Sequence, residues 1–319
     1  MKSFSLFITL LFITQAGFTQ TQAIDYFDFL NQQHNDVVRQ NLLFTQYSVH
    51  SDDYLLVEKM RQDVISKIKS TRLNVKKRKA FEGGLNMRNE LVKVLDIYFE
   101  SFNHDFDQIS ILKKKSKDSY EALEAYFEAE DALEEKLSAA ANNFLAAQKI
   151  YAPEHHIKLS SANENKVIQQ INAVNDYTRV IYMKEFRVSM ANAYFFDALD
   201  KEDVEKMDKN RLALIKVAKE AFQHLSEMQA YKEDDRYLEA AKKLVKFYLN
   251  LGENEYIDLV GITNKSKEVG LNQRDADAFN KIIQEFNENS GKLVDNFNET
   301  MNFLLRNNVP KPEEETKRL

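Results

Sequence analysis

Residues 120–151 read YEALEAYFEAEDALEEKLSAAANNFLAAQKIY, and this stretch decides the fold class. Apolar residues recur at two positions of a heptad along its whole length, which is about nine helical turns. The first position holds Leu123, Leu137, Phe144 and Tyr151, and the second holds Tyr126, Leu133, Ala140 and Ala147. This spacing predicts a long amphipathic helix. We expect the helix to stop at Ala152-Pro153, because proline disfavours helical geometry in the residue before it.

Seven further stretches repeat the pattern, and none sustains the period of two that a strand requires. The eight expected helices span 24–49, 53–80, 85–112, 118–151, 163–199, 202–230, 234–261 and 273–307. Ser51-Asp52 is a suitable cap for the second of them. Short connections such as Glu82-Gly83-Gly84 predict antiparallel neighbours. The predicted fold is all-α: two tandem up-down four-helix bundles with coiled-coil-like packing, elongated and without a sheet.

Helix-breaking residues are rare in this chain. Its 319 residues include three Pro and seven Gly, where average usage would give roughly 16 and 22. Sandwiches, propellers, Rossmann folds and P-loop enzymes all need glycine at tight turns and are excluded. The chain has no Cys, which excludes a disulfide scaffold, thiolate metal sites and a cysteine nucleophile.

The first 23 residues have the order of a secretory signal peptide. Met1-Lys2-Ser3 is basic, residues 4–12 are almost wholly apolar, and polar and small residues follow. The apolar stretch is too short for a transmembrane helix, and we expect cleavage after Gln20 or Ala23. A buried amphipathic N-terminal helix is the alternative. We therefore predict an exported protein of the periplasm or cell exterior, not a lipoprotein, because there is no Cys to acylate.

The predicted domains are bundle 1 at 24–159, bundle 2 at 160–307 and a disordered tail at 308–319. A shift of 150 residues overlays apolar positions of the two halves, which favours an internal duplication. The matched pairs include Val64 with Leu214, Val75 with Leu225, Met87 with Tyr237, Val94 with Leu244, Tyr98 with Tyr248, Phe106 with Tyr256 and Ile109 with Leu259. Pro153 marks the expected join between the two copies.

Three segments of the first half resemble a family of bacterial surface or periplasmic proteins built on four-helix domains of unknown function. They are Phe81-Glu82-Gly83, the helix 91–98 and the closing stretch 144–157. The resemblance covers about 25–159 and, more weakly, 163–307. It implies an exported helical protein and assigns no catalytic residue. Members of that family are often lipid-anchored, and this chain departs from that pattern because it has no Cys.

The histidines and glutamates were considered as metal ligands. Glu154 directly precedes His155 and His156. The chain has six histidines: His34, His50, His104, His155, His156 and His224. Glu100 with His104 and Glu220 with His224 are pairs at i, i+4, but a di-iron bundle needs Glu-x-x-His on two helices. We expect exposed or helix-end histidines, and no metal or cofactor site is predicted.

Other polar positions interrupt the apolar stripes or gather charge. Glu130 shares a heptad position with Leu123: it is either an acid with a raised pKa or, as we expect, a residue at the edge of the stripe with Ala129 turned inward. Asn289 and Ser290 interrupt the last stripe and are expected to set register. The basic runs 76–79 and 113–115 lie at expected helix ends, where cations favour the helix dipole.

The predicted function is a non-enzymatic binding or scaffolding role in the bacterial cell envelope, with an envelope protein or an apolar ligand as partner. A membrane-active or lipid-carrying bundle is the alternative, and a metal-binding bundle is a further one. The net charge of −6 becomes about −7 without residues 1–23, which disfavours nucleic acid. No spanning segment is expected after signal cleavage, and no oligomeric state is predicted.

Overall fold

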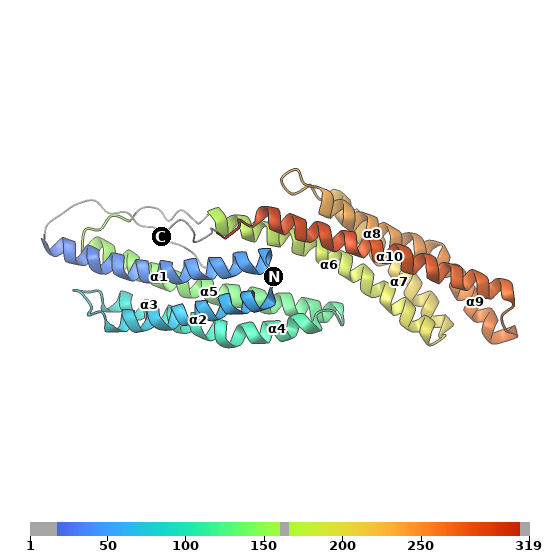
Figure 1. The fold of residues 1–319 in the computed structure, drawn as a ribbon, viewed down its shortest axis with the longest axis horizontal. Helices are drawn as coiled ribbons and strands as arrows, with labels where there is room; N and C mark the ends of the chain where they lie inside the picture. The colour runs from blue at the N-terminus through green and yellow to red at the C-terminus, as the bar shows by residue number, and fades with distance from the viewer. Residues whose placement is uncertain (1–17, 160–165, 313–319) are drawn as a thin grey trace. The chain divides into compact units, whose positions relative to one another are not determined.

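The computed structural model describes residues 18–159 and 166–312, and in these residues the fold is all-α, as predicted (Figure 1). The described residues form no strand, only an isolated bridge between Tyr231 and Asp234. The helices are α1 (Phe18–His50), α2 (Tyr54–Lys77), α3 (Leu85–Glu100), the π-helix η1 (Ser101–Asp105), α4 (Phe106–Lys115), α5 (Tyr120–Glu154), α6 (Lys166–Asp200), α7 (Val204–Glu227), α8 (Arg236–Glu253), α9 (Glu255–Val269) and α10 (Gln273–Asn308).

Helix α5 is the stretch on which the prediction was based. Its N-terminus is capped by Ser119, whose hydroxyl accepts the Ala122 amide at 3.0 Å, and its two predicted stripe positions are all buried. The helix passes Pro153 by one residue, so the expected stop at Ala152-Pro153 is slightly wrong. The actual stop is His156 at φ 54°, after which the Ile157 amide donates to Ala152 O at 2.8 Å, a left-handed termination that closes the last turn.

The chain divides into two compact units, and each is described separately. Unit 1 comprises residues up to Asn175 and from Asn308 onward, and unit 2 comprises Asp176–Asn307. The division falls within α6 rather than in the expected linker at 153–162.

In unit 1, α2 packs against α1 and α3, and α5 packs against α3 and α4. Helix α5 also meets α1: Gln148 Nε2 donates to Asn31 Oδ1 at 2.5 Å, and the rings of His34 and Phe144 lie 5.4 Å apart. The core of unit 1 therefore lies between four helical segments: α1, α2, α3 with its continuation into α4, and α5.

Unit 2 also packs four segments: α6, α7, α8 with α9, and α10. Helix α7 contacts α8 and α9. Aromatic rings fill the space between α6, α8 and α10, as in the pairs Tyr182–Phe297 at 6.4 Å and Tyr237–Phe297 at 5.0 Å. Phe195 of α6 stacks on Tyr256 of α9 at 4.0 Å.

Two expected helices are interrupted, which the periodicity did not predict. The range 85–112 contains the π-helical turn η1, and the range 234–261 breaks at Asn254, where φ is −127° and ψ is −85°. Both breaks fall in the third segment of their unit.

The chain ends only partly match the expectations. The apolar stretch 4–12 of the expected signal peptide lies outside the described residues, and α1 runs through both expected cleavage points. Residues 309–312 were expected to be disordered, which is wrong. Val309 is 2% exposed, and its carbonyl oxygen lies 2.7 Å from His50 Nε2. Val309 therefore belongs to the packed core, and residues 313–319 lie outside the described part.

Candidate functional site

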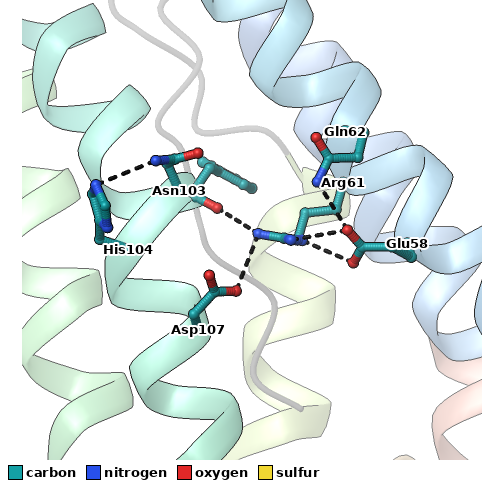
Figure 2. Close-up of polar contacts among 7 residues, drawn as sticks. Glu58, Arg61, Gln62, Asn103, His104 and Asp107 are labelled. Atoms are coloured by element: carbon teal, nitrogen blue, oxygen red, sulfur yellow. Dashed lines mark hydrogen bonds and ion pairs between the residues drawn. The ribbon is translucent and has the colours of Figure 1, made fainter.

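Arg61 of α2 lies at the centre of a polar cluster between α2 and the break in the third helical segment (Figure 2). Its Nε and Nη2 donate to the two carboxylate oxygens of Glu58 at 2.9 and 2.8 Å, one turn earlier. Its Nη1 donates to Phe102 O at 2.8 Å and lies 3.5 Å from Asp107 Oδ1. The guanidinium also lies 5.4 Å from the centroid of the Phe106 ring.

The π-helical turn explains why Phe102 O needs this partner. The Phe106 amide donates to Ser101 O, five residues back, whereas in an α-helix it would donate to Phe102 O. The carbonyl released by the insertion faces α2, and Arg61, with a side chain only 11% exposed, satisfies it. Leaving a buried carbonyl without a donor costs about 1–3 kcal/mol.

Unit 2 has the same arrangement 150 residues later. Arg211 Nε donates to Asp208 Oδ1 at 2.8 Å, and Arg211 Nη1 donates to Gly252 O at 3.0 Å. Gly252 lies in the last turn of α8, directly before the break at Asn254. In both units, an arginine held by an acid one turn earlier satisfies a carbonyl near the break of the third segment. Because each of its three nitrogens already has a partner, we interpret this arginine as a structural brace rather than a ligand-binding group.

His34 is buried, although we expected exposed or helix-end histidines. It is 4% exposed, and its Nε2 lies 3.2 Å from the Tyr98 hydroxyl oxygen. Burial lowers the pKa of His34 to about 4, so the imidazole is neutral at physiological pH. His34 and Tyr98 therefore form a buried pair within the core of unit 1.

Glu130 is also buried, and the expectation that it lies at the edge of the stripe is wrong. Its side chain is 3% exposed, whereas Ala129 is half-buried. Tyr126 donates its hydroxyl to Glu130 Oε1 at 2.5 Å, and Oε2 has no hydrogen-bond partner in the structure.

Glu185 of α6 is a buried acid that the sequence analysis missed. It is 5% exposed, and it accepts a short hydrogen bond from the Ser189 hydroxyl. Burial raises the pKa of Glu185 to about 7, against which the Ser189 hydrogen bond works. The pKa values of three tyrosines are raised as well. The larger cause is burial and the next is the nearby negative charge of Glu185; the tyrosines are Tyr182, Tyr237 and Tyr248. Its position in the apolar stripe, four residues after Ile181, was the available signal.

The other residues singled out from sequence are dispersed. His155 Nε2 lies 2.9 Å from Glu82 O, His104 is an exposed neighbour of Glu100 at 4.0 Å, and Glu220 pairs with Arg187 at 3.5 Å. Asn289 is exposed and donates to Glu285 O in its own helix, so its expected register-setting role in a core stripe is wrong. Within the described ranges, no group of three or more His, Asp or Glu residues could hold a metal ion.

A solvent-open groove of about 490 Å³ lies at the end of unit 1 where α1 begins and α2 ends. Its lining residues are Gln22, Asp25, Tyr26, Lys77, Arg78, Lys79, Ala80 and Phe81. The volume falls within the range of ligand sites, about 300–1,000 Å³. Of the basic run 76–79, Lys76 and Lys77 form the last turn of α2 as expected, but Arg78 and Lys79 lie beyond it and face this groove.

The floor of the groove is fixed by close packing. Tyr26 donates its hydroxyl to Gly84 O at 2.9 Å, and a Cβ on Gly84 would lie 2.4 Å from Tyr26 Cε1. Arg78 stacks 5.2 Å over the Phe29 ring, and its carbonyl accepts from Arg88 Nη1 at 2.9 Å. Gly84 is therefore required for its small size, and Arg78 holds a defined position beside the exposed Lys77 and Lys79.

The comparisons with known proteins give no relative. No known protein family matches the chain, no curated protein matches it, and no solved structure matches it. No helix in the described residues is long and apolar enough to cross a membrane.

Proposed function

We propose that the protein is an exported, non-enzymatic helical protein with a binding or scaffolding role in the cell envelope. The observation that carries this proposal is the groove beside Lys77, Arg78 and Lys79, which is wide enough for a ligand and open to solvent. Concave sites with a few convergent polar groups are where proteins bind their partners. The envelope setting rests on the signal-like residues 1–23.

We further infer that the protein is a tandem pair of four-helix bundles that arose by duplication of one unit. Helices α2 and α7 have the same length of 24 residues and begin 150 positions apart, at Tyr54 and Val204. The arginine braces at Arg61 and Arg211 share that shift. Both units break their third helical segment, and in both an arginine satisfies a carbonyl near the break. This shared feature supports a common origin better than apolar periodicity does, because any two amphipathic helices share a period.

A test of the function uses the full chain with a C-terminal tag in its native host. Fractionation should place the tagged protein outside the cytoplasm, with the chain cleaved after Gln20 or Ala23; cleavage after Gln20 would leave every residue that lines the groove in place. A photo-crosslinking amino acid at position 79, and separately at the exposed position 212 of unit 2, should give a discrete envelope adduct from at least one of them. A cytoplasmic, unprocessed chain would refute export, and the absence of any adduct would refute the binding role.

A further inference from the structure

The groove is a local reversal of the charge of the molecule. Three cations and one carboxylate line it, in a chain whose net charge is −6. Lys77, Arg78 and Lys79 are all exposed. The helix dipole accounts for cations in the last turn of α2, but its effect falls off beyond that turn, where Arg78 and Lys79 lie. A negatively charged occupant would neutralise them.

One wall of the groove is the non-helical segment that follows α2, and some of its backbone groups make no hydrogen bond. Arg78 has φ −70° and ψ 120°, in the extended region, and residues 79 and 80 continue without helix or turn. In the described part of the chain, the backbone groups of Lys79 and Ala80 make no hydrogen bond. A non-helical segment with open N–H and C=O groups can pair with the backbone of an extended peptide.

The three carboxylates Glu313–Glu315 of the same molecule are too close to Val309 along the sequence to reach the groove. Val309 is anchored at His50, and His50 lies 25 residues from Asp25 along the single helix α1, which corresponds to about 37 Å. Glu313–Glu315 lie at most six residues beyond Val309, so they can extend no more than about 21 Å. Glu313–Glu315 therefore cannot supply the carboxylates that would neutralise these cations.

We propose that this groove binds an extended acidic peptide segment of a partner protein. The inference deepens the proposed binding function and rests on it. Isolated pairs between a small ion and an exposed lysine contribute little, whereas carboxylates spaced along one strand would meet Lys77, Arg78 and Lys79 together while its backbone pairs with Lys79 and Ala80. The half-buried Phe81 ring would then pack against the side chains of the peptide that face it.

The test measures fluorescence anisotropy of a fluorescein-labelled dodecapeptide of alternating Glu and Thr, added to the purified protein. We expect binding at 50 mM salt, at least tenfold weaker binding at 300 mM salt, and none of the Lys–Thr counterpart peptide. The double variant Lys77→Glu/Lys79→Glu should lose at least tenfold in affinity. The matched control Lys114→Glu/Lys115→Glu makes the same charge change in the other basic run and should stay within twofold, with unchanged circular dichroism for both.

The inference would be overturned if the Glu–Thr peptide did not bind the wild-type protein at 50 mM salt, or if both double variants lost the same affinity. Displacement of the peptide by an equal concentration of inorganic phosphate would also overturn it, because the site would then bind small anions. Tighter binding of a peptide of residues 310–319 would overturn it as well, because the tail of a second copy would then be the occupant. If the peptide fails while an envelope adduct forms, only the groove assignment is refuted. If no adduct forms from any position, the binding role itself is refuted.

Discussion

The cores of the two units differ in the titratable side chain that each buries. Unit 1 buries the imidazole of His34, whose pKa is lowered to about 4, and unit 2 buries the carboxyl of Glu185, whose pKa is raised to about 7. Both shifts have the same physical cause, since burial disfavours whichever form is charged. A base and an acid buried in this way respond to pH in opposite directions, so the two units should not share one pH of maximum stability.

The signs follow from proton binding by the folded and unfolded states. Between about pH 6.5 and 4, unfolded His34 binds a proton that folded His34 excludes, so unit 1 loses stability as the pH falls. Between about pH 4.5 and 7, unfolded Glu185 releases a proton that folded Glu185 retains, so unit 2 loses stability as the pH rises. Each effect amounts to about 3 kcal/mol, since one pKa unit corresponds to about 1.36 kcal/mol.

The largest expected effect is that of Glu185→Gln. Glutamine has the shape of the protonated acid, so at pH 8 the variant should stabilise unit 2 by about 3 kcal/mol and flatten its pH dependence between 4.5 and 7. Hydrogen exchange of α6 and α8 peptides, corrected for intrinsic rates, measures this for unit 2 alone. The exposed Glu220→Gln is the control and should leave the slope unchanged. If the stability of unit 2 in Glu185→Gln still fell between pH 4.5 and 7 as in the wild-type protein, Glu185 would not be the cause of the different pH dependence of the two units.

The second prediction concerns the stability of unit 1 at acidic pH, which depends on His34. The wild-type protein should lose about 3 kcal/mol of unit 1 stability between pH 6.5 and 4, and His34→Gln should show no loss in that range beyond what the carboxylates contribute. Exchange of α3 peptides reports this change, and the imidazole resonances of His34 should titrate near pH 4. A His34 midpoint near 6.5 would contradict its burial beside Tyr98.

The periodicity of the sequence was sufficient for the all-α class because a long stripe of apolar residues has few other ways to be buried. It could not predict the breaks at 101–105 and Asn254, because each is held by an arginine 41 residues earlier in the sequence. A contact of that kind is tertiary and leaves no local signal. The same limit applies to the groove, whose lining comes from α1, α2 and the loop that follows it.

The buried acids show a different limit. Glu130 was recognised as lying in the stripe but was expected at its edge, because carboxylates are seldom buried. Tyr126, one turn earlier, supplies the donor that makes its burial tolerable, and Ser189 does the same for Glu185. A carboxylate in an apolar stripe with a hydroxyl donor four residues away is a pattern that sequence analysis could use.

The arginine braces should differ in strength although their geometry is shared. Arg61→Met should destabilise unit 1 by about 2–3 kcal/mol, because Phe102 O loses the Arg61 donor and Glu58 loses its ion pair and keeps only the Gln62 hydrogen bond. Arg211→Met should cost unit 2 about 1–2 kcal/mol, since Ile257 stands where unit 1 has Asp107. Exchange of α3 and α8 peptides measures both. An equal cost would show that Asp107 contributes nothing.

One glycine in each unit tests how tightly its surroundings are packed. Gly84→Ala should destabilise unit 1 by about 1–3 kcal/mol, because the new Cβ would overlap the Tyr26 ring and Phe81 O. Gly261→Ala in α9 meets no atom within 4 Å, so it should stabilise unit 2 by about 0.5–1 kcal/mol through helix propensity. Thermal unfolding distinguishes the two signs. A neutral Gly84→Ala would mean that the groove floor relaxes at little cost.

The smallest expected difference concerns the caps of α2 and α7. The α2 cap is Asp53, one residue after the predicted Ser51-Asp52; its carboxylate accepts the Leu55 and Leu56 amides at 2.9 and 3.2 Å. The Asp203 carboxylate accepts one backbone amide, that of Lys206, at 3.2 Å. Asp53→Ala should therefore cost about 1 kcal/mol, and Asp203→Ala should cost less. Exchange in the first turns of α2 and α7 measures the pair. Exposed ion pairs usually contribute little to stability. If Asp203→Ala nevertheless cost more than Asp53→Ala, the exposed ion pair between Asp203 and Lys206 would contribute more than the additional backbone hydrogen bond of Asp53.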